Sequence, residues 1–579
     1  MDISKEHLIK LLNTGTNQYI IPFFQRPYVW KKEDCENLLE DILATYEEGK
    51  IKPQKEHFIG TVITKINSSS TQMAAKYNLV DGQQRMTTFC LVIKALANSV
   101  DSTVEGANFL IKNINSSLFY EDAYGKVHYR IIHNRLDKKS FDLVMQSDCD
   151  TDIDITSNGS KIIDTYLFFK EKFKDFTNEE ILALNVTILH KFPAINMVLD
   201  HNDDEQEIFD TINSLGVKLT TSELLKNHIF NDDETKEHYK EYWEDIFEVD
   251  EETVKFWNTK KTAGRVYREN IDVLLYCYLL IEKEKDVSLE HLFKDYKAWL
   301  KDKKFEDKKE FLQALKTYAE IYFSLPSGTE LESLRFSDNE KRFFHIIENL
   351  NITTVYPLIL FLYKNIEDTY EREKCLILLE SYLVRRAVCK LTTKNYNNLF
   401  ISLIKQLKEV ETPKLIDSLS EILLSYSDDT SRFPSDEEFK TGFANSVFSN
   451  QYSKEFLFII TLYHVNTVLH DITSLSSESF SVEHIMPKKW QSNWQANLTP
   501  EEKNYRNQKL LTLGNLTIIT RNLNSKLRNS AWAVKKEILT EYSSLPLTTK
   551  YVNSPDWNEQ TISDRANDLY ATALIIWKK

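Results

Sequence analysis

The stretch NLVDGQQRMTTF, residues 78–89, runs from a strand-like segment through a single glycine directly into a helix. Apolar residues then recur at helical spacing, at Phe89, Val92, Ile93 and Leu96. Free N–H groups and the positive end of the helix dipole converge on such a turn, and glycine lets an anion approach closely. An ordinary turn in which Asp81 caps the helix has the same pattern. The stretch therefore predicts an α/β fold. Its turn is either an anion-binding site or an ordinary turn capped by Asp81.

Three neighbouring segments support the α/β prediction. QYIIPFF (18–24) and HFIGTVIT (57–64) have the composition of strands, and EDCENLLEDIL (33–43) has apolar residues at helical spacing. FFQRPYVW (23–30) places a second Gln–Arg pair at the end of a predicted strand, and strand ends in α/β sheets cluster at one edge. The two pairs favour a phosphate-handling cleft. The residues predicted for it are Gln25, Arg26, Asp81, Gly82, Gln83, Gln84, Arg85, Thr87 and Thr88.

No GxxxxGK[ST] run occurs in the sequence, so a nucleotide in this cleft would be held by a fold other than the P-loop. Arg85 is suited to the task, because a guanidinium can fork onto a phosphate.

The length and composition indicate a helix-rich α+β protein of several domains. A chain of 579 residues exceeds one hydrophobic core, and 12 glycines and 12 prolines are few enough for long helices. Helical periods dominate from about residue 235 to 440, and polar runs suggest the boundaries. We predict an α/β domain with a helical extension over 1–232, a helical domain over 233–435 and a C-terminal domain over 436–579.

The cysteines and the apolar runs indicate the cellular compartment of the protein. Six scattered cysteines without a CxxC pair fit a reducing cytoplasm, and no signal peptide or membrane-length apolar run is recognisable. We therefore expect a cytoplasmic protein without a membrane partner.

Charge is distributed unevenly along the chain. The net charge of −15 opposes non-specific binding to nucleic acid or to an anionic membrane. Residues 482–550 nevertheless contain eleven lysines and arginines against five acidic residues, a local charge of +6. This basic segment is where we expect DNA to bind. The side chains predicted to contact phosphates are Lys488, Lys489, Lys526, Arg528, Lys535 and Lys536.

The basic segment opens with SVEHIMPKKW (481–490), in which an acid and a histidine adjoin. Such a pair alone is weak evidence for catalysis, since most histidines have structural roles. LLTLGNLTIIT (510–520) predicts a second strand, and RNLNSKLRNSAWAVKKEIL (521–539) predicts a helix. A hairpin followed by a helix brings the end of the first strand against the start of the helix. This is the ββα-metal arrangement.

Phosphodiester hydrolysis needs a base that deprotonates water and a metal ion that neutralises phosphate charge. His484 suits the base, because an imidazole is mostly neutral at physiological pH. Glu483 and Asn524 offer oxygen ligands for a hard divalent cation such as Mg²⁺. Asn515, the fourth residue of this catalytic group, is expected to position the loop and His484.

Several of these motifs resemble the GmrSD-type, modification-dependent (type IV) restriction endonucleases. The N-terminal resemblance rests on IPFFQRPYVW, FIGTVI, DGQQRMTT and FDTINSLGVKLTTSELLKNHIF (209–230), and the helical part resembles the family at YLVRRAVCKLTTKNYNNLF (382–400). For Arg385 and Arg386 within that helix, we expect solvated or ion-paired side chains. The resemblance implies an N-terminal ParB/sulfiredoxin-like domain that binds and hydrolyses nucleoside triphosphates through the DGQQR and FQR elements.

The C-terminal part resembles the HNH (His-Me finger) nuclease domain of the same family, through EHIMP, LGNLTI, NxNS and a closing helix over about 561–577. Glu483 stands where many HNH nucleases have Asp, which keeps a carboxylate. No cysteine follows Cys389, so a Cys₄ zinc site is excluded from this domain.

We therefore expect an NTP-regulated, Mg²⁺-dependent endonuclease that cleaves modified double-stranded phage DNA in host defence. The helical domain would couple the two ends or form a homodimer. One alternative is a ParB-like, nucleotide-switched DNA-binding protein without cleavage, which would leave a plasmid supercoiled. Another is an RNA-directed toxin nuclease, which would degrade cellular RNA.

Overall fold

The computed structural model describes the chain except for residues 14, 16, 23–24, 26, 71–72, 149–159, 201–202, 204–219, 231–236, 264–265, 302–304, 412–413 and 495–496. Arg26, Cys149 and the first half of the quoted 209–230 stretch lie outside the described residues. The chain divides into two compact units, Met1–Asp232 and Asp233–Lys579, and each is described here by itself.

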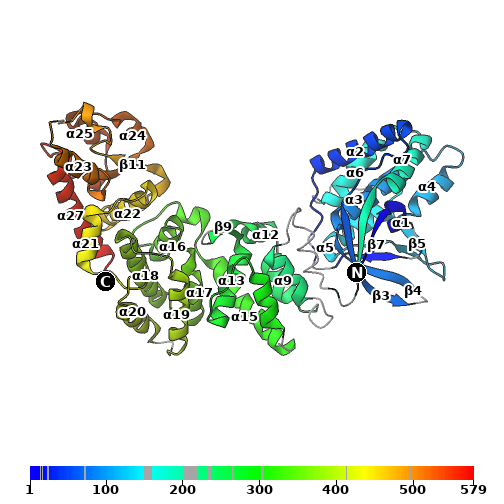
Figure 1. Ribbon diagram of the computed structural model, residues 1–579, viewed down its shortest axis with the longest axis horizontal. Helices are drawn as coiled ribbons and strands as arrows, with labels where there is room; N and C mark the ends of the chain where they lie inside the picture. The colour runs from blue at the N-terminus through cyan, green and yellow to red at the C-terminus, as the bar shows by residue number, and fades with distance from the viewer. Residues whose placement is uncertain are drawn as a thin grey trace. The chain divides into compact units, whose positions relative to one another are not determined.

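The first unit is built on a six-stranded mixed sheet (Figure 1). Its strands, in spatial order, are β1 (Asp2–His7), β8 (Pro193–Leu199), β3 (Thr61–Ser70), β4 (Met73–Asp81), β2 (Gln18–Ile20) and β7 (Ile131–Ile132). A separate hairpin pairs β5 (Phe119–Glu121) with β6 (Val127–Tyr129). The predicted strands at 18–24, 57–64 and 77–80 correspond to β2, β3 and β4.

The helices of the first unit are α1 (Leu8–Leu12), α2 (Lys32–Ile51), α3 (Gln83–Ala97), α4 (Ala107–Asn115), α5 (Arg135–Gln146), α6 (Lys161–Phe173), α7 (Asn178–Lys191) and α9 (Thr221–Ile229). α3 is buried along almost its whole length and packs against α4 and α6, while α2 packs against α7. One continuous core of apolar side chains from these helices and the sheet fills the unit.

Five strands of the first unit were not predicted from the sequence, namely β1, β5, β6, β7 and β8. β8 lies between β1 and β3, antiparallel to the first and parallel to the second. The segment PAINMVL is a short apolar run, and periodicity alone does not distinguish such a run from buried helix. The sheet is therefore completed by a strand from late in the unit.

The turn between β4 and α3 depends on glycine. Gly82 has a φ of +89°, in the left-handed region that other residues rarely adopt. A Cβ at this position would lie 3.2 Å from Val62 Cγ2 and 3.3 Å from the Thr61 carbonyl oxygen. Glycine thus permits both the sharp turn and the close approach of β3.

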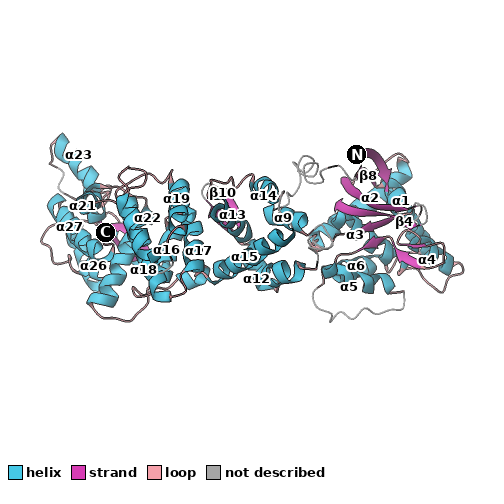
Figure 2. Ribbon diagram, turned by 90° about the horizontal axis from the view of Figure 1, so that it is seen from below, coloured by secondary structure: helices cyan, strands magenta, loops and turns pink. Residues whose placement is uncertain are grey.

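The second unit is mostly helical, as the colouring in Figure 2 shows. A short hairpin of β9 (Lys260–Ala263) and β10 (Val266–Glu269) interrupts the helical run expected there. The longer helices up to residue 463 are α12 (Glu251–Asn258), α13 (Asn270–Lys283), α14 (Leu292–Leu300), α15 (Phe305–Ser324), α16 (Asn339–Asn349), α17 (Tyr356–Asn365), α18 (Thr369–Val388), α19 (Tyr396–Lys408), α20 (Leu415–Ser425), α21 (Asp436–Asn445) and α22 (Asn450–Tyr463).

Arg385 and Arg386, on α18, are fully buried rather than solvated. The Arg385 guanidinium pairs with Asp436 at 2.6 Å and donates to the Trp577 carbonyl at 2.7 Å. Arg386 donates to main-chain carbonyls of the 429–432 loop. Both side chains therefore join α18 to later parts of the unit.

The last part of the chain has the predicted order of strand, loop, strand and helix. Its elements are β11 (Phe480–His484), α23 (Pro500–Lys509), β12 (Leu516–Thr520), α24 (Arg521–Leu527), α25 (Trp532–Tyr542), α26 (Pro546–Thr549) and α27 (Glu559–Ile576). The single helix expected over 521–539 is in fact two helices. Arg528, with a φ of +43°, ends α24 and separates it from α25. Among the described helices, none is long and apolar enough to cross a membrane.

Candidate functional site

β11 and β12 form an antiparallel pair that ends at the predicted catalytic residues. Glu483 lies opposite Thr517, and His484, the last residue of β11, lies opposite Leu516. α24 packs against both strands, so the helix that carries Asn524 contacts the strand that carries Glu483. The structure thus brings the hairpin and the helix together in the order that the sequence predicts.

Asn515 holds the loop that follows His484. It lies in a 3₁₀ turn, Leu513–Asn515, and is fully buried. Its Oδ1 accepts hydrogen bonds from the Met486 N–H and from Trp557 Nε1, both at 2.9 Å. Its Nδ2 donates to the carbonyls of Met486 at 2.8 Å and Leu510 at 2.9 Å. The amide is fully occupied by these bonds, so Asn515 positions the loop and does not face a ligand.

The closing helix α27 holds the same turn from the other side. The buried Arg565 guanidinium donates to the carbonyls of Leu513, Gly514 and Leu516 at 2.6 to 3.1 Å. A Cβ on Gly514 would lie 2.2 Å from the Ile562 carbonyl oxygen, so only glycine permits this packing.

His484 is half-buried and uncharged at neutral pH. Burial, together with the nearby charges of Lys488 and Lys535, lowers the pKa of its imidazole to about 4. Within the described part of the chain, the ring makes no hydrogen bond. A neutral, unpaired imidazole is the form that accepts a proton from water.

Asn524 contacts β11 through its amide nitrogen. Nδ2 donates to Ser481 Oγ at 2.9 Å and to the Val482 carbonyl at 3.1 Å. Because a carbonyl can only accept, this contact fixes which way the amide points. Oδ1 faces away from that carbonyl and has no hydrogen-bond partner among the described residues. Alternate side chains of a strand share a face, so Ser481, and with it Asn524, lies on the same face of β11 as Glu483.

Glu483 forms a buried ion pair with Lys535 of α25. The Lys535 ammonium also donates to the His484 carbonyl at 2.8 Å. Burial raises the pKa of the Glu483 carboxyl and lowers that of the Lys535 ammonium, and each charge partly offsets the effect on the other. The prediction that Lys535 contacts DNA is therefore wrong, because its side chain is fully enclosed.

The donor set fits a hard cation in type. Glu483 offers a carboxylate and Asn524 an amide oxygen, from two elements that pack together. The described residues hold no group of three or more His, Cys, Asp or Glu that could bind a metal ion. A cation here would be held by few protein groups and several waters, as Mg²⁺ commonly is.

The other five residues predicted to contact phosphates differ in exposure. Lys488, Lys489, Lys526 and Arg528 are exposed, and Lys526 lies over the Tyr542 ring at 4.1 Å from its centroid. Lys536 is half-buried and donates to the Ser554 carbonyl at 3.3 Å. Four of the six side chains are thus free to meet a phosphate backbone.

Of the residues predicted for the N-terminal cleft, Gln83, Gln84 and Thr87 line a narrow crevice at the start of α3. The other residues that line it are Ile21, Tyr28, His133, Asn134 and Asp137. Gln84 bridges to the 23–30 segment, because its Oε1 accepts from the Val29 N–H at 2.9 Å and its Nε2 donates to the Pro27 carbonyl at 3.2 Å. The hydroxyls of Thr88 and Tyr28 share a hydrogen bond of 2.7 Å.

Gln25 and Arg85 are occupied by the protein itself. Gln25 is buried and donates to the Val80 carbonyl at 3.3 Å. Arg85 donates to the Ile59 carbonyl at 2.6 Å and pairs with Asp81 at 3.3 Å. Arg85 therefore joins α3 to the entry of β3, and binding of a phosphate by its guanidinium would first require these contacts to break.

Five residues of the crevice were not predicted from the sequence, Ile21 and Tyr28 and three polar residues of one later segment. His133, Asn134 and Asp137 follow β7, which pairs with β2, and this pairing brings them to Gln25 and Thr87. Burial lowers the pKa of His133 to about 3. His133 Nδ1 and Gln83 Oε1 are buried without a hydrogen-bond partner among the described residues. The sequence signal for these polar residues was HNR (133–135), which directly follows the apolar, strand-like pair II (131–132).

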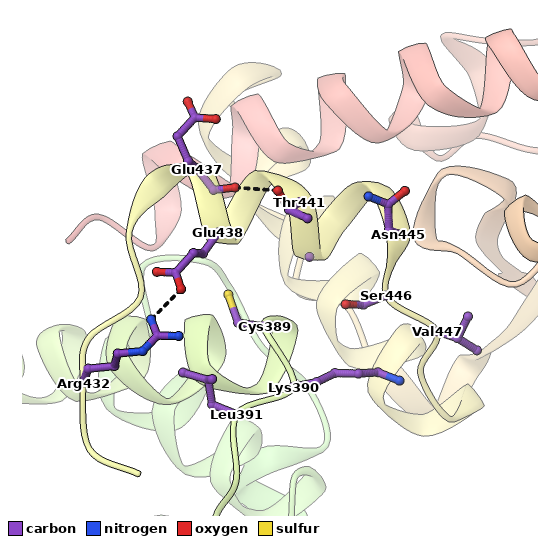
Figure 3. A pocket seen from close by; sticks show the side chains of 11 residues that line it. Cys389, Lys390, Leu391, Arg432, Glu437, Glu438, Thr441, Asn445, Ser446 and Val447 are labelled. Atoms are coloured by element: carbon purple, nitrogen blue, oxygen red, sulfur yellow. Dashed lines mark hydrogen bonds and ion pairs between the residues drawn. The ribbon is translucent and has the colours of Figure 1, made fainter. Parts of the chain in front are cut away.

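A larger cavity of about 560 Å³ lies in the second unit, between the end of α18 and α21. Figure 3 shows Arg432 turned toward Glu438, with which it pairs at 2.6 Å. Cys389 also lines the cavity, and burial raises the pKa of its thiol to about 11. None of the residues predicted for catalysis or for nucleotide binding lines it.

The hairpin and the helix that follows it thus carry a neutral histidine next to a glutamate in the sequence, an asparagine amide oxygen without a partner among the described residues, and several exposed cations, which are groups that suit phosphodiester cleavage. This part of the chain is joined to an α/β unit with a separate polar crevice. The comparisons with known proteins agree with this class and identify the family.

Residues 8–230 match the family described as the GmrSD restriction endonuclease, N-terminal domain, and residues 433–572 match the GmrSD restriction endonucleases, C-terminal domain. The chain belongs to the GmrSD family of restriction endonucleases, which confirms the predicted resemblance. An uncharacterized protein of Methanocaldococcus jannaschii is 23% identical over 303 residues, which are 49% of this chain and 49% of that protein. The chain thus matches about half the length of this relative.

Proposed function

We propose that the protein is a divalent-metal-dependent DNA endonuclease of the HNH type, regulated by a nucleoside triphosphate and directed at modified phage DNA. The observation that carries the proposal is the site at the end of β11. There His484, whose imidazole is neutral, directly follows Glu483, and Asn524 is held against the same strand with an amide oxygen that has no partner among the described residues.

In this proposal His484 takes a proton from the attacking water, because its imidazole is uncharged and half-exposed at neutral pH. Glu483 and Asn524 would hold a Mg²⁺ ion, which supplies charge neutralisation at the phosphate when bound. Lys488, Lys489, Lys526 and Arg528 hold the DNA backbone, and Asn515 keeps the loop beside His484 in place.

The N-terminal unit is proposed to bind the nucleotide at the start of α3. Support comes from Gln83 Oε1 and His133 Nδ1, which are buried at the start of α3 without hydrogen-bond partners among the described residues. The crevice that they line has no space for a water molecule as it stands, so a ligand would have to widen it. Buried polar atoms are nearly always hydrogen-bonded, so two unpaired atoms in one crevice suit a place where a ligand or water supplies the bond. The free N–H groups of the first turn of α3 add an attraction for anions.

The test is cleavage of matched modified and unmodified phage DNA with Mg²⁺ and each nucleoside triphosphate in turn. We expect cutting of modified DNA and no cutting when Mg²⁺ is chelated. His484→Ala should lower cleavage by about 10²- to 10⁴-fold, the usual contribution of a general base. Hydrolysis of the nucleotide should persist in this variant, because His484 belongs to the other unit.

A His484→Ala protein that cuts as the wild type does would remove His484 as the base. A wild-type protein that leaves all DNA supercoiled would favour the nucleotide-switched binding protein, and degradation of cellular RNA would favour the toxin nuclease.

A further inference from the structure

Lys535 occupies an unusual position for a lysine. It projects from α25 with no exposed side-chain surface, on the same helix face as the buried Trp532 and Leu539. Its ammonium contacts two groups of β11, the Glu483 carboxylate and the main-chain carbonyl of His484. One side chain thus contacts both residues proposed to act on the phosphate.

Stability alone does not account for this arrangement. Lysine is almost never fully buried unless it is paired, and a buried ion pair can often be replaced by apolar residues of similar volume without loss of stability. A methionine or leucine on α25 would continue the apolar face formed by Trp532 and Leu539. The buried ammonium is therefore better explained by its contacts with Glu483 and His484 than by a contribution to the stability of the fold.

The contacts of Lys535 determine the geometry of the site. Of the two residues proposed to bind the cation, Glu483 is the one with a carboxylate. Its ion pair with Lys535 restricts the rotamers that it can adopt. The second contact ties the main chain at His484 to α25, which fixes where the imidazole leaves the strand. Side chains that hydrogen-bond to metal-binding carboxylates orient them in this way.

We propose that Lys535 is a positioning residue of the nuclease site, holding the Glu483 carboxylate and the His484 main chain in the arrangement that receives a divalent cation. This inference rests on the proposed function, since it takes Glu483 as a ligand of the cation.

The direction in which removal of Lys535 changes cation binding distinguishes a positioning role from simple charge repulsion. An ammonium beside a carboxylate repels a dication, so if charge alone mattered, removing it would tighten cation binding. If Lys535 positions the carboxylate, removing it loosens cation binding, because the ligand no longer has one orientation.

The test measures binding of Mn²⁺ to the full chain by calorimetry, without DNA, and binding to this site is defined as the part that Glu483→Gln removes. We expect Lys535→Met to raise the Kd for Mn²⁺ by about 10- to 100-fold. The matched control is Lys509→Met, another buried lysine of the second unit, which donates to the Ala444 carbonyl and to Asn445 but touches no carboxylate among the described residues. This control should bind Mn²⁺ as the wild type does, and melting temperatures of both variants report the fold.

A Kd that is unchanged or lower in Lys535→Met overturns the proposal, and so does wild-type binding that Glu483→Gln fails to reduce. If Lys535→Met does not fold, Lys535→Arg replaces it. A planar guanidinium keeps the charge but cannot reach both acceptors in the same geometry, so the Kd should rise by about tenfold. An unchanged Kd in that variant also overturns the proposal. DNA cleavage is measured separately, so a wild type that binds Mn²⁺ without cutting DNA counts against the proposed function alone.

Discussion

Asn515 and His133 are both buried polar side chains, but they differ in how completely their hydrogen bonds are satisfied. Asn515 uses its amide oxygen twice and its amide nitrogen twice. His133 bonds Thr87 through Nε2 at 2.9 Å, while Nδ1 lies 3.8 Å from Asp137 with no hydrogen bond. An unpaired buried polar atom costs about 1–3 kcal/mol. The first residue therefore has a structural role, and the second is free to meet a ligand.

His133 gives the first unit a pH-dependent stability. Its pKa is about 3 in the folded chain, because burial disfavours the charged ring, and 6.5 without that burial. Between these values the unfolded chain binds a proton that the folded chain does not, so the free energy of unfolding falls as the pH falls. From about pH 7 to about pH 5 this loss is about 2 kcal/mol. His133→Gln has no imidazole to protonate. Over this pH range we expect its free energy of unfolding to fall by about 2 kcal/mol less than that of the wild type.

Hydrogen exchange of α3 amides in the full chain, corrected for the intrinsic effect of pH, measures this difference locally. The prediction fails if wild type and His133→Gln lose the same opening free energy between the two pH values.

The positions of the side chains at the proposed nuclease site could be predicted only in part from sequence. The acid–histidine pair and the amide on the following helix were recognisable, because short motifs preserve their order along the chain. Lys535 was assigned to the surface, since lysines usually lie there. Its spacing from Trp532 and Leu539 placed it on the apolar face of α25, and this was the signal that a residue-type argument overlooked.

At the scale of elements, the sequence predicted β3 and β4 but missed β8 and both short hairpins, β5–β6 and β9–β10. β3 and β4 are neighbours in sequence and in space. β8 enters the sheet from far along the chain, and no local pattern indicates which strands it will pair with. The same reason hid His133, which reaches the crevice only through the pairing of β7 with β2.

The start of α3 offers a test of how closely elements approach. Gly82→Ala meets two costs, a left-handed φ of +89° and contacts of 3.2 and 3.3 Å to β3. Gly106→Ala is the matched control, because Gly106 precedes α4 with a φ of +86° and has nothing within 4 Å of its added Cβ. We expect the control to lose about 1–2 kcal/mol from backbone conformation alone. Gly82→Ala should lose at least about 1 kcal/mol more.

Urea unfolding of the full chain, followed by circular dichroism, compares the two variants. Equal losses would mean that β3 moves aside without cost and that the close approach does not constrain the turn.

At the scale of the whole molecule, the proposed function requires an acidic chain to bind a polyanion. The net charge of −15 repels DNA at a distance, while the segment 482–550 carries a local charge of +6. Burial of Lys535 removes one of these cations from the surface and pairs it with Glu483. Binding therefore depends on a small number of exposed cations close to the proposed site.

Because DNA releases counterions for each phosphate that is neutralised, the logarithm of the binding constant falls with the logarithm of salt concentration by about 0.9 per contact. Removing both exposed lysines after β11, in Lys488→Ala/Lys489→Ala, should therefore reduce this slope by about 1.8. Fluorescence anisotropy of labelled DNA, without Mg²⁺ and over a series of salt concentrations, measures it. Lys308→Ala/Lys309→Ala on α15 removes the same charge outside the basic segment and should leave the slope unchanged. Equal slopes in both variants would place the DNA contacts elsewhere on the molecule.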